Sequence, residues 1–477
     1  MKFIDIYKVR AIILLFLLFS IIDSCKKSFL QQVPTDVIPT VAFYKTAEDL
    51  TGAVNGAYAY QRSIYSNYFL YNIEEIRSDN TSNKLGAQAE QRAADNFQAD
   101  QGNYIFGNDW AESYTCINLC NAIINRGPSI NMDNTLRDRL IGEAKFIRAQ
   151  TYFCLVQDYG GVPLRLTEST SLSGDNTLAR ASVPDVYNSI VGDLVFAATA
   201  LPKNYTGSDV GRATSGAALG LLGKAYLQEG KKDSAAFYLQ QVVRSNEYQL
   251  LPKYADLWAP ANKNTAESLF ELQYFPPKDG SPFWNNQATP AVPTNLVPGG
   301  TNTAFPSVPT QDLLDAYEPG DLRFPASVAF DVNGRPYSIK FRDTTELTGG
   351  QARNNFPILR YSDILLSLAE ALGESTQAYA LINQVRERAG LSDISAATPG
   401  TFFDKIQHER QVEFAFECQR WHDLLRLPSS QAISIMNADL ARDLTGQNIS
   451  IDQHDLLCPI PVTETQTNSL VVQNPGY

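Results

Sequence analysis

The sequence has few of the residues on which metal and nucleophile chemistry usually depends. Among its 477 residues there are three histidines and six cysteines. It also lacks the H-E-x-x-H motif of zinc proteases, the G-x-S-x-G elbow of serine hydrolases and the phosphate-binding P-loop. The usual sequence signals for these enzyme classes are therefore missing.

Positive charge is also scarce. The chain carries 39 lysines and arginines against 51 aspartates and glutamates, a net charge of −12. Nucleic acid binding needs a basic face, because lysine and arginine contacts with phosphate supply much of the affinity. We therefore expect no nucleic acid partner. The 4 tryptophans, 23 tyrosines and 24 phenylalanines do provide rings for ligand stacking.

Long apolar runs are absent beyond the N-terminus. The run at 11–22 is too short for a membrane span, which needs about 20 residues, and it follows a basic start, as in a signal peptide. Cys25 comes soon after it and resembles a bacterial lipobox cysteine, although Asp23 departs from the usual small residue. We predict a signal peptide at 1–24 and a single mature domain at 25–477, anchored through a lipid on Cys25. The alternative is an ordinary secretory signal. The basic residues that precede the apolar run are Lys2, Lys8 and Arg10.

The five remaining cysteines do not suggest a disulfide framework, because their number is odd. Cys116 and Cys120 are four residues apart on an expected helix, but no histidine is near them to complete a zinc site. We expect all five to be buried as small apolar side chains. They are Cys116, Cys120, Cys154, Cys418 and Cys458.

Helical periodicity recurs in eight segments, most of which pair off along the chain. Thr46 and Asp49 form a capping box, Gly160-Gly161 ends the third helix, and Pro184 opens the fourth. The Gly/Ala/Tyr pattern of 217–239 resembles a tetratricopeptide repeat, in which small residues let paired helices approach closely. The expected helices cover 46–62, 110–126, 136–159, 184–202, two helices within 213–243 separated at Gly230, 361–374 and 375–391.

We therefore predict a mainly α fold with a tetratricopeptide-like scaffold of about eight helices at 46–250 and 361–391. Residues 251–360 differ, since they hold 14 of the 25 prolines, which disfavour long helices and central strands. Asn333-Gly334 predicts a β-hairpin with a type I′ turn. We expect a loop-rich insert with short hairpins on the ligand side.

The stretch HERQVEFAFECQRWHDLLRL, residues 408–427, is dense enough in functional groups to suggest an active site. Its histidines, His408 and His422, are 14 residues apart, about 21 Å along one helix. They could share an ion only if that helix broke. Cys418 has His422 at i+4, but its aromatic neighbours favour burial. Burial raises the pKa of a thiol and makes the thiol less reactive. We expect no metal, cofactor or catalytic residue here.

The glutamates of this stretch favour a structural role. They recur every four residues and would share one helix face, where like charges destabilise the helix and need cations nearby. The VRERAG segment at 385–390 supplies arginines. We predict an ion-pair network that holds the C-terminal segment, 401–477, on the scaffold. Its members are Glu409, Glu413, Glu417, Arg386, Arg388 and Arg420.

Four stretches of the sequence together carry a resemblance to a known family. They are AKFIRAQTYFCLVQDYGGVPL (144–164), INQVRERAGL (382–391), HERQVEFAFECQRWHDLLRL (408–427) and LCPIPVTETQTNSLVVQNPGY (457–477). In this order and spacing they resemble the SusD/RagB family of outer-membrane lipoproteins of the Bacteroidetes. With the lipobox and the paired helices, the resemblance covers essentially the whole mature chain. Family members usually carry glycine where Cys418 stands in F-E-C-Q-R.

The resemblance implies a non-catalytic nutrient-binding subunit without a cofactor. Such a protein faces the cell exterior on a lipid anchor such as palmitate, captures oligosaccharides, or in some members peptides, and forms a lid on a SusC-like TonB-dependent transporter. The scaffold helices would contact the transporter, and loops elsewhere would bind the ligand.

Loop residues offer the chemistry that sugars need, because sugar C–H faces pack on aromatic rings and hydroxyls bond to polar side chains. Two segments, 65–110 and 274–286, combine both. The predicted ligand contacts are Tyr71, Asp79, Asn80, Trp110, Phe283, Trp284 and Asn285.

The sequence also leaves room for three other functions. One alternative to the oligosaccharide binder is a peptide-binding protein of the same architecture. A secreted glycan hydrolase is also possible, because any two carboxylates could converge in the fold. A purely structural tetratricopeptide adaptor is disfavoured by the aromatic insert.

Overall fold

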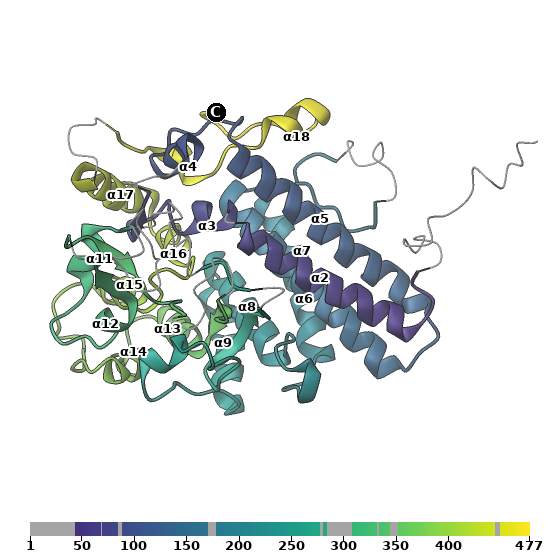
Figure 1. Ribbon diagram of the computed structural model, residues 1–477, viewed down its shortest axis with the longest axis horizontal. Coiled ribbons are helices and arrows are strands. Elements are labelled where there is room, and N and C mark those ends of the chain that lie inside the picture. Colours follow the sequence, from purple (N-terminus) through teal and green to yellow (C-terminus); the bar gives the residue numbers. More distant parts are fainter. Residues whose placement is uncertain are drawn as a thin grey trace, which may run out of the picture.

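The computed structural model describes residues 43–67, 69–83, 88–169, 178–276, 280–283, 308–331, 333–343, 352–443 and 449–477. Long helices lie side by side in one half of the molecule, and the insert and much of the C-terminal segment form the other half (Figure 1). Within the described residues, no helix combines the length and hydrophobicity that crossing a bilayer requires.

All eight predicted helices are present, and the mainly α fold is confirmed. They pack in chain order, each against the next, so that α9 is followed in space by α13 although the insert separates them in sequence. The scaffold helices are α2 (Ala47–Ser66), α5 (Tyr104–Arg126), α6 (Asn134–Tyr159), α7 (Val183–Ala200), α8 (Ser215–Gln228), α9 (Lys232–Ser245), α13 (Tyr361–Leu372) and α14 (Thr376–Arg388).

Local sequence sets the helix ends. The Thr46 hydroxyl accepts from the Asp49 backbone N–H, and the Asp49 carboxylate accepts from the Thr46 N–H, as in the predicted capping box. At the end of α6, Gly160 has φ +74°, a conformation that glycine adopts readily. The next residue, Gly161, leaves no room for a side chain, because a Cβ there would overlap the carbonyl oxygen of Ala181.

We expect Gly161→Ala to lower the free energy of unfolding by about 1–3 kcal/mol, because the backbone must shift to relieve the overlap. Gly192→Ala in α7 is the matched control, since a Cβ at Gly192 meets no atom within 4 Å. It should raise stability by roughly 0.5–1 kcal/mol through helix propensity. Urea denaturation of both variants measures the difference. Equal effects would show that Gly161 is not sterically required.

The structure also contains helices that the periodicity did not reveal, most of them short. They are α3 (Phe69–Glu74), α4 (Ala89–Asp95), α11 (Gln311–Ala316), α12 (Phe324–Ser327), α15 (Phe402–Glu413), α16 (Arg420–Leu424), α17 (Ser429–Asp443) and α18 (Val462–Thr467), with 3₁₀ turns η1 (Gly127–Ser129), η2 (Gly207–Asp209), η3 (Tyr254–Trp258) and η4 (Gln453–Leu456).

Short antiparallel strand pairs secure the insert. The pair β2 (Ser268–Leu272) and β6 (Phe356–Arg360) lies near its two ends, so the chain leaves the scaffold and returns at one place. The pair β1 (Thr81–Ser82) and β3 (Val308–Pro309) joins the segment after α3 to the insert.

The predicted hairpin forms from β4 (Val328–Phe330) and β5 (Pro336–Ser338), with Val328 opposite Ser338. Its turn is not type I′, which joins two strands through two residues. The Asp331 N–H donates to the Arg335 carbonyl, so three residues separate the paired positions here. The Asp331 carboxylate accepts backbone N–H bonds from Asn333 and Arg335, and these bonds hold a wider turn.

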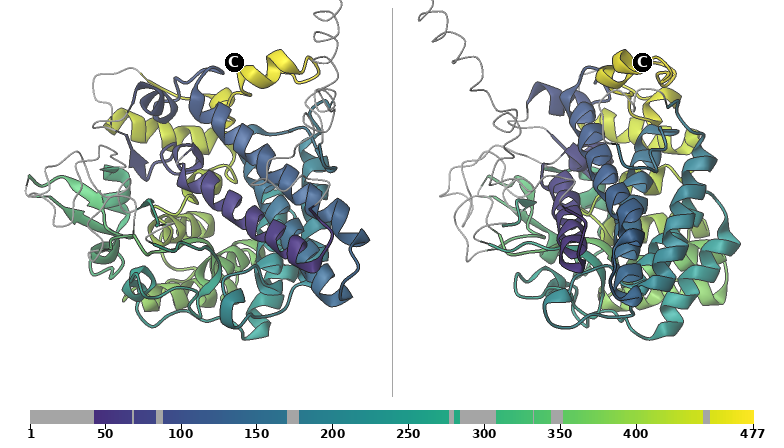
Figure 2. Two further views of the ribbon diagram at one scale, coloured as in Figure 1. Left: turned by 45° about the vertical axis from the view of Figure 1, so that its right-hand side comes forward. Right: turned by 90° about the vertical axis from the view of Figure 1, so that its right-hand side faces the viewer.

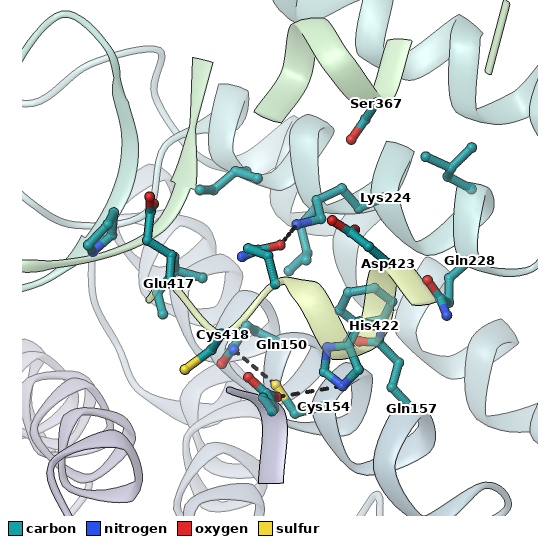
Figure 3. Close-up of a pocket in the computed structure, with 18 of the residues that line it drawn as sticks. Gln150, Cys154, Gln157, Lys224, Gln228, Ser367, Glu417, Cys418, His422 and Asp423 are labelled. Atoms are coloured by element: carbon teal, nitrogen blue, oxygen red, sulfur yellow. Dashed lines mark hydrogen bonds and ion pairs between the residues drawn. The ribbon is translucent and has the colours of Figure 1, made fainter. Parts of the chain in front are cut away.

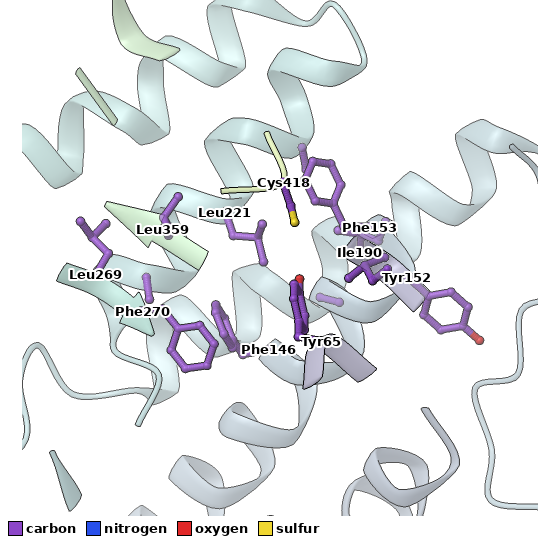
Figure 4. Packing of buried hydrophobic residues seen from close by; sticks show 14 of the residues in the cluster. Tyr65, Phe146, Tyr152, Phe153, Ile190, Leu221, Leu269, Phe270, Leu359 and Cys418 are labelled. Atoms are coloured by element: carbon purple, nitrogen blue, oxygen red, sulfur yellow. The ribbon is translucent and has the colours of Figure 1, made fainter. Parts of the chain in front are cut away.

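The hydrophobic core joins the scaffold to the C-terminal segment. Figure 4 shows Cys418 beside Leu221 of α8 and near Tyr65 of α2. Cys418 has φ +57°, in the left-handed region where glycine is favoured, which explains the glycine usual at this position. All five described cysteines are free thiols, and four are buried as predicted, whereas Cys154 is partly exposed.

Candidate functional site

A groove of about 580 Å³ runs along α5. Trp110, Tyr114, Asn118 and Asn121 project into it, because residues three or four apart share one helix face. The loop after α6 and the C-terminal helix α18 form its other walls. Figure 2 shows α18 lying against one end of α5.

Trp110 is fixed at the floor of the groove. Its ring packs on Tyr114 at 5.1 Å and edge-on against Tyr159 at 5.2 Å between ring centroids. Its Nε1–H donates to Glu464 of α18 at 3.3 Å. Arg165 pairs with the same carboxylate at 3.3 Å and lies over the Tyr114 ring at 4.6 Å. Trp110 is 4 % exposed, so its ring offers little of its surface to a ligand.

The amides of the groove build its wall. Asn118 exchanges two hydrogen bonds with the Ser169 backbone, and Asn121 donates to the carbonyls of Arg165 and Thr167. Exposed threonine hydroxyls on the groove are accessible to a ligand, although those of Thr115 and Thr467 also donate to carbonyls of their own helices. The exposed threonines are Thr115, Thr167, Thr463 and Thr467.

The groove lacks the acid pair of a glycosidase. Among its described lining residues, Glu464 is the one carboxylate, whereas glycoside hydrolysis generally uses two, about 5–10 Å apart. Polar hydroxyls, an arginine and partly covered rings suit reversible binding of a hydroxyl-rich molecule.

Two predicted ligand contacts, Tyr71 and Phe283, are core residues. Phe283 is fully buried and stacks on Phe356 at 4.2 Å between centroids. Tyr71 is 4 % exposed and meets Phe283 edge-on at 6.4 Å. Both assignments to ligand binding are wrong for this structure, because the rings fill an aromatic cluster rather than facing solvent.

Asp79 and Asn80 are also enclosed. Arg420 donates to both oxygens of Asp79, each at 2.7 Å, and this bidentate pair is buried. Asn80 is fully buried, and its backbone carbonyl accepts from Thr310 at 3.0 Å. Neither side chain can reach a surface ligand, so these two predictions are wrong as well. Trp284, Asn285 and Cys25 lie outside the described residues.

The glutamates of the 408–427 stretch meet arginines from several segments. Glu409 pairs with Arg386 at 3.0 Å, and Glu413 pairs with Arg388. Helix α15 ends at Glu413, and Phe416 has φ +69°, so Glu417 lies in an irregular turn rather than on the same helix. Arg420 departs from the prediction, since it pairs with Asp79 instead of these glutamates.

Three cations of the insert complete this network, and the sequence did not reveal them. Arg323 pairs with Glu409 and Glu413, and Arg360 pairs with Glu413 at 3.0 Å and Glu417 at 2.8 Å. Lys340 pairs with Glu417 at 2.6 Å. We call these glutamates with Arg323, Arg360, Lys340, Arg386 and Arg388 the C-terminal ion-pair network.

The network keeps Glu413 ionised. Burial by itself would raise the pKa of this carboxyl, but the guanidinium groups of Arg388, Arg360 and Arg323 outweigh it and hold the pKa below its ordinary value. Burial lowers the pKa of Lys340 to about 8, against the opposing attraction of Glu417. Groups so enclosed cannot meet a substrate, which agrees with a structural role for the network.

His408 and His422 do not share a site. The helix breaks between them, and His408 lies beside Glu318 at 3.5 Å, whereas His422 lies 2.9 Å from Asp158. Burial raises the pKa of the Cys418 thiol well above its usual value, which agrees with an unreactive cysteine.

Comparison with known proteins covers both halves of the molecule. Residues 325–477 match the family model described as SusD family, and residues 28–227 match one described as starch-binding associating with outer membrane. A SusD-like protein of Bacteroides ovatus is 28 % identical over 454 residues, which cover 84 % of this chain and 79 % of that protein.

Other relatives match over nearly the full length. SusD-like protein P2 of Formosa agariphila is 26 % identical over 518 residues, 99 % of each chain. A solved laminarin-binding SusD-like protein is 27 % identical with a TM-score of 0.75, and the match covers 91 % of this chain and 100 % of that one. Because the matches take in the helical scaffold and the C-terminal segment alike, the chain belongs to the SusD family.

Proposed function

We propose that the protein is a non-catalytic binder of oligosaccharides that hands its ligand to a SusC-like TonB-dependent transporter. The observation that carries the proposal is the α5 groove, which joins exposed hydroxyls to an aromatic floor and has a single carboxylate in its described lining. Family membership and the laminarin-binding relative support glucose polymers as the ligand class. Attachment to the outer membrane through a lipid on Cys25, facing the exterior, belongs to the same proposal.

Calorimetric titration with laminarin oligosaccharides tests this function. We expect saturable, weak binding, because the aromatic rings of the groove are largely covered. Incubation with the same oligosaccharides should release no new reducing ends. Appearance of reducing ends would favour a hydrolase, and binding of peptides in place of glycans would favour the alternative ligand class.

The groove itself is best tested from its exposed rim. Trp110→Ala would confuse binding with stability, because the ring packs on Tyr114 and Tyr159. Thr115 is exposed on α5 and lines the groove, so Thr115→Trp should fill the groove without disturbing the core. We expect an affinity loss of about ten-fold or more, equivalent to about 1.4 kcal/mol.

Thr199→Trp is the matched control. Thr199 is also an exposed helical threonine whose hydroxyl donates to the carbonyl four residues earlier, as Thr115 does, but it lies on α7 away from the groove. It should leave affinity unchanged. If Thr115→Trp binds as tightly as the control while Trp284→Ala loses binding, the ligand site lies at the insert instead.

Delivery to a transporter is tested by co-purification. A tagged form of this protein, extracted from outer membranes in mild detergent, should retain a TonB-dependent barrel, and Cys25→Ala should release the protein from the membrane fraction. A membrane-free protein with Cys25 intact would contradict the anchor.

A further inference from the structure

Three side chains from distant parts of the chain come together, and two of them line one small cavity. Glu74 ends α3, Asp158 lies in the last turn of α6, and His422 lies in α16. The imidazole Nε2 of His422 is 2.9 Å from an oxygen of Asp158 and 3.9 Å from an oxygen of Glu74. One ligand atom from each residue lies within 4.8 Å of the others. Figure 3 shows His422 at the wall of this cavity, near Cys154.

The two carboxylates are buried without full compensation. Glu74 is 3 % exposed and Asp158 is fully buried. Oxygen Oε1 of Glu74 and oxygen Oδ2 of Asp158 accept no hydrogen bond within the described structure. The nearby cation Lys224 is already paired with Asp363 at 2.6 Å. An unpaired buried carboxylate is costly, so this arrangement favours a cation between the two acids.

A third buried acid lies near these two carboxylates. Asp109 is also buried, and its Oδ1 accepts no hydrogen bond from the described residues. The cavity holds about 50 Å³ beyond the protein atoms, and Glu74 and His422 both line it. That is enough for an ion with a bound water, since one water needs about 10–15 Å³ on this scale.

We propose that Glu74, Asp158 and His422 bind one divalent transition-metal ion, Zn²⁺, with water as a fourth ligand. Ligand atoms around a tetrahedral zinc ion at about 2.0–2.2 Å lie roughly 3.3 Å from one another. The observed separations of 2.9 and 3.9 Å lie on either side of that value, so small side-chain movements suffice. An imidazole ligand favours zinc over calcium, which prefers oxygen ligands alone.

The ion would join the helical scaffold to the C-terminal segment. Its ligands come from α3, α6 and α16, and Asp158 and His422 are 264 residues apart in sequence. A site that exists only in the folded chain stabilises that chain when metal binds. The role is structural and does not depend on glycan binding.

The protein offers an internal control. Asp452, His454 and Asp455 also lie close together, but Asp452 is exposed and its carboxylate already accepts from the backbone N–H and the imidazole of His454. His454→Gln should therefore leave zinc binding unchanged. Glu74→Gln preserves shape and removes one buried charge, so this variant should fold at least as well as the wild type in the absence of metal.

Native mass spectrometry of chelator-treated protein with added Zn²⁺ tests the site. We expect one zinc ion per chain in the wild type and in His454→Gln, and none retained in Glu74→Gln or His422→Gln. Zinc should also raise the Tm of the wild type by a few degrees. Circular dichroism without metal checks that each variant is folded, and X-ray absorption should show only N and O ligands.

The wild-type result decides the proposal even if a variant fails to fold. Absence of bound zinc in the wild type would overturn it, as would stabilisation by Ca²⁺ with none by Zn²⁺. Retention of the full zinc stoichiometry by folded Glu74→Gln would place the ion elsewhere and would equally contradict the assignment.

Discussion

Glu413→Lys is expected to prevent stable folding. Glu413 is fully buried and contacts three arginines, Arg323, Arg360 and Arg388. A lysine there would add a fourth buried cation to them and remove the carboxylate that offsets their charge. Breaking one buried pair typically costs about 3–5 kcal/mol, and total stability is only about 5–15 kcal/mol. Reversing the charge at Glu413 should therefore remove most or all of the free energy of unfolding.

Soluble yield and chemical denaturation measure the effect. Glu387→Lys is the matched control, because Glu387 is an exposed glutamate on α14, one residue from both Arg386 and Arg388. The same charge change there should alter stability by less than about 0.5 kcal/mol. A Glu413→Lys protein as stable as the control would show that the C-terminal ion-pair network does not hold the fold together.

Arg420→Met should destabilise the protein by about 3–5 kcal/mol, because it leaves the Asp79 carboxylate buried without its bidentate partner. Removing both charges in Asp79→Leu/Arg420→Met should recover most of that loss, since a buried ion pair can often be replaced by apolar residues of similar size. The two changes are thus expected to be strongly non-additive.

A double-mutant cycle from urea denaturation gives the coupling energy between Asp79 and Arg420. A coupling of about 2 kcal/mol or more is the expected result for this pair. Additive single effects would mean that the two side chains do not depend on each other, contrary to the paired geometry.

The scaffold could be predicted from sequence because its determinants are local. The capping box at Thr46 and the glycines after α6 mark helix ends within a few residues, and apolar periodicity marks the faces between them. Most of the missed helices are too short to show a periodic pattern; α3, for example, has six residues. Longer α15 and α17 lie in the C-terminal segment, where charge patterning rather than periodicity drew attention.

The ion-pair partners of the candidate residues could not be predicted where they lie far away in the sequence. Regular spacing of Glu409, Glu413 and Glu417 indicated that cations must be near, but nothing local pointed to Arg323 or Arg360 in the insert. An aspartate in a polar loop looks the same whether it faces solvent or, like Asp79, meets an arginine 341 residues later. Aromatic rings such as Phe283 are equally ambiguous until the segments that cover them are placed.

The groove illustrates the same limit. Trp110 could be singled out as a candidate, but its partner Glu464 is 354 residues away, on a tail helix that closes the groove. The sequence offered no reason to bring α18 onto α5. Thr115, Thr463 and Thr467 carry no motif and were not foreseen, because exposed threonines are common on any helix surface.

The C-terminal ion-pair network should hold the fold together, and the α5 groove should bind the ligand. Titration of laminarin oligosaccharides into Glu409→Gln and Thr115→Trp tests this division of roles most directly. Glu409→Gln should remain folded, because Arg323 keeps Asp321 and Glu413 as partners and Arg386 keeps Glu318. Affinity should be unchanged in Glu409→Gln and reduced about ten-fold or more in Thr115→Trp. Loss of binding in a fully folded Glu409→Gln, with normal binding in Thr115→Trp, would contradict this division of roles.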